Sequence, residues 1–232
     1  MQARLIVVLI FTMVIIRGMQ QPEWRIDPRP VPYLDAITAM EARVAALAEG
    51  QVGELIWLLE HPAIYTAGSS SKPGDLIKPR FPVYQTGRGG QITYHGPGQR
   101  VAYAVLDLRQ RGHDVRRHVC DLERWGQATL AHFGVKAETR QGRVGLWVSG
   151  TNGREDKIMA VGVRVRRWIA YHGIALNVHP DLDHFKGIVP CGIQDARYGV
   201  TSMNALGKSV SLTEVDQALR KSFVGIFNRP QC

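Results

Sequence analysis

The chain has 232 residues, of which 45% are hydrophobic, 21% charged and 8% aromatic. A chain of this length can bury roughly 70–75% of its unfolded surface in one core, which excludes a peptide, a disordered tail and a disulfide-stapled mini-domain. Lys and Arg outnumber Asp and Glu by 29 to 20, and the net charge of +9 favours acidic partners.

An apolar segment occupies residues 5–16, interrupted by Thr12 and flanked by Arg4 and Arg17. As a helix it would rise about 18 Å, which is short of the roughly 30 Å hydrocarbon core of a membrane. No small-x-small cleavage site follows it. Two interpretations stay open: translation begins at Met19, or the segment is a peripheral anchor or a cleaved leader. We expect residues 1–18 to be an extension and residues 19–232 to form a single domain.

Apolar residues recur every three or four positions over residues 33–49 and predict an amphipathic helix that ends at Gly50. A second helix is predicted over residues 114–133, and a third opens at Thr213 with Asp216 as a weak capping box. Between the helices, short apolar or alternating runs predict strands at residues 55–59, 83–85, 91–94, 101–106, 146–148, 161–165 and 168–178. This order predicts an α+β fold, a sandwich in which helices cover one side of a sheet.

Residues 88–98, RGGQITYHGPG, combine four glycines and a proline with Arg88 and His95. Glycine lets the backbone approach a ligand closely and leaves N–H groups free to bind it. A tight hairpin with a glycine loop is the structural alternative. The segment matches neither the Walker nor the Rossmann nucleotide-binding pattern.

Three cysteines, an odd number with no metal-binding spacing, indicate a reducing compartment. Cys191 lies between Pro190 and Gly192, a turn that can hold a thiol outside the core, although most lone cysteines are simply buried. Cys120 fits the buried alternative, because we place it on the apolar side of the second helix. A nucleophilic Cys191 needs a nearby cation or base, and the candidates are Lys157, Lys186 or a histidine. Lys157 opens a mostly apolar strand, where it is either partly desolvated or an ordinary strand-end lysine.

Taken together, several segments resemble the lipoate–protein ligase B family of octanoyltransferases. The matching motifs are EHPAIYTAG (60–68), RGGQITYHGPGQRVAYAVLDL (88–108), GLWV (145–148), KIMAVGVRV (157–165), HGIALNV (172–178), FKGIVPCGI (185–193) and VTS (200–202). Their order and spacing cover residues 34–202. The main departure is Met159, which replaces a smaller residue near the expected pocket.

The resemblance implies a biotin/lipoate protein ligase-like fold and an acyltransferase that performs the first step of lipoate biosynthesis. It implies Cys191 as the nucleophile and Lys157 as its partner. The acyl and pantetheine site would be lined by Arg88, Gly89, Gly90, Gln91, Ile92, Thr93, Tyr94, His95, Ala160, Val161, Gly162, Gly173, Ile174 and Ala175. Neither a cofactor nor a metal is implied.

The implied donor is octanoyl-acyl carrier protein. The implied acceptors are the lipoyl domains of 2-oxoacid dehydrogenase E2 subunits and the glycine cleavage H protein. We expect a cytoplasmic protein without stable membrane association.

Two alternatives belong to other classes of function. An ATP-dependent lipoate or biotin ligase of the same fold would also need a lysine at position 157 but no cysteine. A basic nucleic-acid-binding module rests on net charge alone, because the basic residues are scattered apart from clusters at 116–117 and 164–167. The Cys191 motif favours the transferase, and we expect no nucleic-acid partner.

Overall fold

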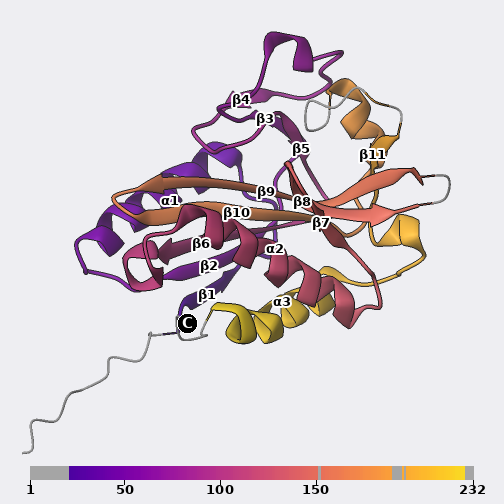
Figure 1. Ribbon diagram of the computed structural model, residues 1–232. Helices are drawn as coiled ribbons and strands as arrows, with labels where there is room; N and C mark the ends of the chain where they lie inside the picture. Colours follow the sequence, from indigo (N-terminus) through magenta and orange to yellow (C-terminus); the bar gives the residue numbers. More distant parts are fainter. Residues whose placement is uncertain (1–20, 151–152, 190–194, 196, 228–232) are drawn as a thin grey trace, which may run out of the picture.

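Within the residues that the computed structural model describes, which are 21–150, 153–189, 195 and 197–227, a mixed eight-stranded sheet forms the centre of the molecule (Figure 1). Seven of its strands follow the order β1-β2-β6-β10-β9-β8-β7, and β11 pairs with β9. The pairs β1–β2 and β9–β11 are parallel and the others antiparallel. The strands are β1 (Glu23–Ile26), β2 (Leu55–Leu59), β6 (Gln99–Asp107), β7 (Glu138–Arg140), β8 (Arg143–Ser149), β9 (Glu155–Arg166), β10 (Ile169–Asn177) and β11 (Tyr198–Val200).

Helices cover both faces of this sheet (Figure 1). Helix α1 (Tyr33–Ala48) packs Met40 and Val44 on one face, whereas α2 (Val115–His132) and α3 (Leu212–Phe227) lie side by side on the other. The prediction that the helices cover one side is therefore wrong. Strands β2, β6 and β10 are buried at every position, so each of their faces needs a cover.

A second, smaller sheet in the order β4-β3-β5 lies above the large one in Figure 1. Its strands are β3 (Ile64–Ala67), β4 (Val83–Gln85) and β5 (Thr93–His95). Side chains from this sheet and from the short helix η4 (Leu182–Gly187) form a separate aromatic cluster around Tyr65, Tyr94 and Phe185. Other short 3₁₀ helices in the described residues are η1 (Pro73–Asp75), η2 (Leu108–Arg111) and η6 (Asn204–Leu206).

Local sequence explains the end of α1 and the starts of α2 and α3. Gly50 has a φ of +73° and closes α1, and the Asp114 side chain accepts the Arg117 N–H at 3.0 Å to cap α2. The cap of α3 differs from the predicted one. Ser211 and Glu214 form the capping box, with the Ser211 N–H donating to Glu214 Oε2 at 2.8 Å.

Cys120 is exposed on α2, so its prediction as a buried residue is wrong. The buried face of this helix passes through His118, Leu122 and Trp125, and Cys120 lies between these positions on another side. In the part of the chain that the structure describes, no helix combines the length and the apolar character that membrane crossing requires.

Candidate active site

A cavity of about 430 Å³ lies on the α1 face of the large sheet, beneath the small sheet. This volume is in the range of small-molecule sites. Its lining comes from distant parts of the chain: Tyr33, Ser70, Arg88, Gly90, Gln91, Ile92, Thr93, His95, Val101, Tyr103, Gly142, Arg143, Val144, Trp147, Lys157, Ala160, Val161, Gly162, His172, Gly173, Ile174 and Ala175.

Small residues at paired positions on β9 and β10 make the hollow. Ala160 lies opposite Ala175 and Gly162 opposite Gly173 in the antiparallel register. A Cβ atom at Gly173 would lie 2.3 Å from the Ala102 carbonyl oxygen, and one at Gly162 would lie 2.9 Å from Arg88 Cδ. A side chain at Gly173 would collide with the backbone of β6, and one at Gly162 would displace the Arg88 side chain.

Lys157 reaches this cavity because of a β-bulge in β9. Leu146 pairs with Met159 while the next β8 residue, Trp147, pairs with Lys157, so Ile158 is the extra residue. A bulge shifts the alternation of side chains by one position. Lys157 therefore lies on the same face as Ala160, although their positions differ by three, which in a regular strand would put them on opposite faces.

The Lys157 side chain is only 9% exposed and has a defined place. Its Nζ donates a hydrogen bond to the Val144 carbonyl oxygen at 2.8 Å and lies 4.8 Å from the centre of the Trp147 ring. Both contacts favour a cation at this position. The ammonium group is thus held at the wall of the cavity.

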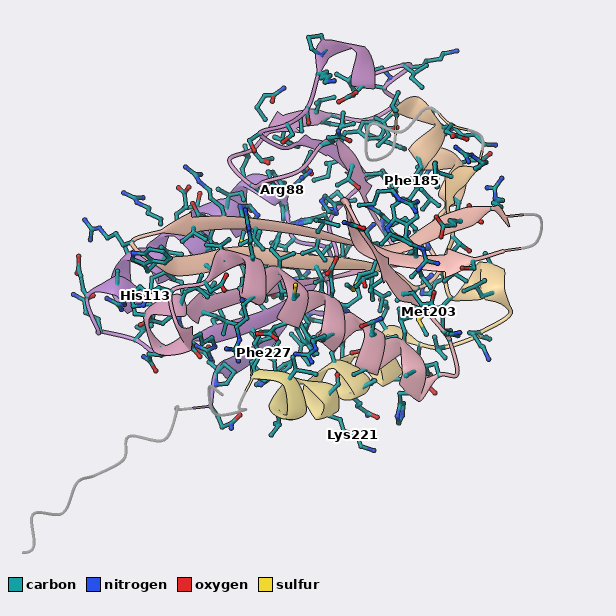
Figure 2. The ribbon with its side chains drawn as sticks, in the orientation of Figure 1. Arg88, His113, Phe185, Met203, Lys221 and Phe227 are labelled. Atoms are coloured by element: carbon teal, nitrogen blue, oxygen red, sulfur yellow. The ribbon has the colours of Figure 1, made fainter. Side chains whose placement is uncertain are left out.

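Arg88 lies between the small sheet and the β9–β10 hairpin (Figure 2). Its Nη2 donates to the Thr66 carbonyl oxygen at 2.7 Å and to Thr66 Oγ1 at 2.8 Å. The next residue, Gly89, donates its N–H to the Val163 carbonyl oxygen at 2.8 Å. These bonds hold the glycine-rich segment 88–90 against the edge of the cavity.

His95 and His172 form part of the polar side of the cavity, and a third buried histidine, His61, contacts the lining residue Tyr103. His61 donates from Nδ1 to the Val31 carbonyl oxygen at 2.6 Å, so its Nε2 accepts the Tyr103 hydroxyl at 2.7 Å. His95 Nδ1 lies 2.6 Å from Gln99 Oε1, and the His172 ring packs edge-on against Tyr103. Burial lowers the pKa of His61 to about 4 and those of His95 and His172 to about 3. All three rings are therefore neutral at neutral pH.

The structure brings most of the predicted site residues together. Arg88, Lys157, His95 and all the predicted residues on β9 and β10 line the cavity, as do 90–93. The side chain of Tyr94 instead joins the aromatic cluster with Tyr65 and Phe185, and Gly89 contributes its backbone bond to β9. Cys191 lies outside the described residues. The catalytic and binding roles of these residues stay predictions.

Several cavity residues were not predicted from the sequence, among them Tyr33, Tyr103, Arg143, Trp147 and His172. His172 and Trp147 lie inside the quoted motifs HGIALNV and GLWV, which was the available signal. Tyr33 had none, because it opens the amphipathic helix α1 and looks like an ordinary core residue. Among the described residues, no group of three or more His, Cys, Asp or Glu side chains is arranged to hold a metal ion.

Comparison with known proteins identifies the family. The model of the lipoyl protein ligase A/B catalytic domain matches residues 32–224. The octanoyltransferase of Paramagnetospirillum magneticum is 61% identical over 206 residues, covering 88% of this chain and 96% of its own. That of Parvibaculum lavamentivorans is 59% identical over 215 residues, covering 91% and 95%.

Solved structures share the fold at low sequence identity. A lipoate protein ligase from Thermoplasma acidophilum superposes with a TM-score of 0.64 at 16% identity, covering 89% of this chain and 84% of that one. A lipoate-protein ligase A bound with ATP gives 0.63 at 18% identity, covering 88% and 85%. This chain, with its mixed sheet flanked by helices and its cavity between two sheets, belongs to the family of lipoyl protein ligase A/B catalytic domains.

Proposed function

We propose that the protein is an octanoyltransferase that moves an octanoyl group from acyl carrier protein to a lysine of a lipoyl domain, through a thioester on Cys191. The observation that carries this proposal is the identity of 57–61% with relatives named octanoyltransferase over 88–91% of the chain. The proposed acceptors are the lipoyl domains of 2-oxoacid dehydrogenase E2 subunits and the glycine cleavage H protein. The site of the reaction is the cytoplasm, and residues 19–232 form the catalytic domain.

The first half-reaction acylates the enzyme. The Cys191 thiolate, stabilised by the Lys157 ammonium, attacks the carbonyl carbon of the octanoyl thioester. The bond to the pantetheine sulfur breaks, and Lys157 donates its proton to the departing thiolate. This leaves octanoyl-Cys191, free carrier protein thiol and a neutral Lys157.

The second half-reaction restores the starting state. Neutral Lys157 takes a proton from the acceptor ammonium, and the resulting amine attacks the Cys191 thioester. The amide forms, the second amine proton leaves to water, and the Cys191 thiolate is released beside the Lys157 cation. One proton is released for each octanoyl group transferred.

Two features of the described residues support the pairing of Lys157 with Cys191. Before the cysteine, Val189 is buried and donates its N–H to the Asp75 carbonyl oxygen at 2.8 Å. After it, the chain returns to the sheet in β11, where Val200 pairs directly with Lys157. The segment that carries Cys191 is thus anchored on both sides, and one anchor is next to Lys157.

The cavity supports the assignment of an acyl substrate. Val101, Ala160, Ile174 and Ala175 offer an apolar wall, and the nearby histidines are neutral. Burying the six methylenes of an octanoyl chain contributes about 0.8 kcal/mol each, or about 5 kcal/mol in total.

Filling this wall is expected to change the preferred chain length. Ala175 on β10 is 5% exposed and faces Ala160 across the strands, so Ala175→Leu shortens the cavity. We expect kcat/KM for the octanoyl donor to fall at least about tenfold relative to that for a butanoyl donor, because several methylenes lose their site. The ratio of kcat/KM for the two donors needs no separate control for folding, because misfolding would lower both values equally. An unchanged ratio would place the acyl chain elsewhere.

The positive charge is expected to accelerate the encounter with acidic carrier proteins. Raising the ionic strength from about 10 mM to about 150 mM shortens the screening length from about 30 Å to about 8 Å. We expect kcat/KM to fall several-fold for carrier-bound octanoate and little for octanoyl-pantetheine, which lacks a protein surface. Equal salt sensitivity of the two donors would exclude a role for the protein charge.

The test of the function uses octanoyl carrier protein and a lipoyl domain with every nucleotide removed by apyrase. The proposal predicts full transfer and no pyrophosphate. The fold relationship with ATP-bound lipoate-protein ligase A makes a ligase the second candidate. Dependence on ATP with release of pyrophosphate would establish that candidate and overturn the transferase.

A further inference from the structure

A single peptide group connects Lys157 to a buried carboxylate on the other side of the sheet. The carbonyl oxygen of Val144 accepts the Lys157 Nζ hydrogen bond at 2.8 Å. The N–H of the same peptide, at Gly145, donates to Glu123 Oε1 at 2.8 Å. Glu123 is on α2 and is only 8% exposed. Ammonium, peptide and carboxylate thus form one chain of hydrogen bonds.

The backbone at Gly145 is adapted to this arrangement. Its φ of +114° lies in the region that L-residues rarely adopt, next to the register shift between Leu146 and Trp147. A Cβ atom at Gly145 would lie 2.5 Å from the Met159 carbonyl oxygen and 3.4 Å from Lys157 Nζ. The peptide can therefore approach the lysine closely only with glycine at this position.

The charges around the cavity make Glu123 distinctive. The charged residues that line the cavity, among those described, are all cations: Arg88, Arg143 and Lys157. The nearby carboxylates of β9 are already engaged, Glu155 by Arg140 and Arg143 and Asp156 by Arg154. Within the described residues, Glu123 has no arginine as a partner, and its charge interacts with Lys157.

A carboxylate bonded to a peptide N–H polarises that peptide and makes its carbonyl oxygen a stronger acceptor. We propose that Glu123 is a positioning residue for Lys157: through the Val144–Gly145 peptide its negative charge fixes the lysine at the cavity wall and supports the protonated state. This inference rests on the proposed function, in which the Lys157 cation stabilises the Cys191 thiolate and then donates its proton.

Burial raises the pKa of Glu123, which gives the proposal its own signature. As the pH falls, Glu123 takes up a proton above the ordinary glutamate value of about 4.3 and loses its charge while Lys157 keeps its own. The hydrogen-bond chain from Glu123 through the Val144–Gly145 peptide to Lys157 should then weaken. A purely structural Glu123 would leave the lysine insensitive to this titration.

The test compares Glu123→Gln with Asp121→Asn. Glutamine retains an oxygen for the Gly145 N–H and removes only the charge. Asp121 is a matched control, because it is a partly buried carboxylate on the same helix with a raised pKa, and its partners are Arg117 and Arg124. Circular dichroism defines the pH range in which each variant stays folded.

The primary readout is the ¹³Cε NMR signal of Lys157, assigned with Lys157→Arg, between pH 7.5 and the acid limit of the folded state. We expect an acid titration step above pH 4.3 in the wild type and in Asp121→Asn, and no step in Glu123→Gln. The same step in Glu123→Gln, or none in the wild type, would overturn the proposal. This result does not depend on transferase activity, so a failure of this proposal can be distinguished from a failure of the proposed function.

Octanoyl transfer supplies the second readout. We expect Glu123→Gln to lower kcat about tenfold at pH 7.5 with KM nearly unchanged. The ratio of the wild-type kcat to that of the variant should approach one in acid, where the protonated Glu123 of the wild type is as uncharged as the glutamine. A constant ratio at every pH, or equal loss in Asp121→Asn, would contradict a role of the Glu123 charge.

Discussion

Lys157→Met is expected to slow octanoyl transfer by about a hundredfold or more at neutral pH. Methionine has a similar length and can keep the contact with the Trp147 ring, but it carries no charge and no proton. The enzyme then lacks the cation that stabilises the thiolate and the group that exchanges protons with the leaving thiol and the acceptor amine. Proton transfer by a positioned side chain contributes typically 10²–10⁴-fold. Rates of enzyme acylation and of complete transfer, measured separately, check both roles.

The pH dependence of this loss separates the roles of Lys157. A thiol without help ionises with a pKa of about 8.5, so acylation of the Lys157→Met variant should recover in part as the pH rises toward 9. Lys157→Arg is the matched control: arginine keeps the cation that stabilises the thiolate but does not release its proton and so never becomes a base, and we expect acylation to survive better than transfer. Wild-type rates for Lys157→Met in a folded protein would remove Lys157 from the mechanism.

Marked loss of stability in acid is the second large effect that we expect, caused by four buried histidines. Burial lowers the pKa of His61 and His118 to about 4 and those of His95 and His172 to about 3. These rings stay neutral in the folded protein, whereas the unfolded chain takes up protons below about pH 6.5. Their contribution to stability is complete above pH 6.5 and is lost as the pH falls toward 4.

The magnitude is large compared with the stability of a domain. A displacement of one pKa unit corresponds to about 1.4 kcal/mol, so each histidine can lower the free energy of unfolding by roughly 3 kcal/mol at pH 4. The total free energy of unfolding of a domain is about 5–15 kcal/mol. Asp216 acts in the opposite direction. Burial raises its pKa to about 6, so below that pH the folded state binds a proton that the unfolded chain does not yet bind, which stabilises the folded state. We expect the loss caused by the four histidines to exceed this gain and the protein to unfold before pH 4.

Urea midpoints at pH 7.5, 6.0 and 5.0 measure this loss. We expect the midpoint to fall at each step. His118→Phe removes one titrating ring from the contact with Phe227 and should reduce the slope by about one proton, whereas His132→Gln, at an exposed position, should leave the slope unchanged. A midpoint that is independent of pH would show that these histidines are not held neutral by burial.

Much of the fold could be predicted because its elements carry strong local patterns. The apolar period of α1 and the run of β2 appear at the predicted residues, and β4 coincides with its prediction. Strands β1, β3 and β11 were not predicted, since each has only three or four residues and depends on partners far along the chain. Strand β7 pairs with the adjacent β8, but its three residues, ETR, carry no apolar pattern. An apolar stripe also shows that a helix packs, but not on which face of a sheet, which is why the helices were misplaced to one side.

Contacts between distant parts of the chain also limited what could be predicted of the site. The motif residues of β9 and β10 could be recognised locally, but the bulge at Ile158 that turns Lys157 into the cavity depends on the register with β8. The bond between His61 and Tyr103 joins residues far apart in sequence. Glu123 had no signal at all, because a glutamate on an amphipathic helix looks like a surface residue until its bond to Gly145 is seen.

The most direct test of the account is the mass of the enzyme after incubation with octanoyl carrier protein in the absence of acceptor. We predict the gain of one octanoyl group, located by peptide mapping on the peptide that contains Cys191, and its loss when a lipoyl domain is added. Cys120→Ala and Cys232→Ser serve as controls and should acylate normally, whereas Cys191→Ala should show neither acylation nor transfer. An octanoyl group on another residue, or rapid transfer by Cys191→Ala, would contradict the covalent mechanism.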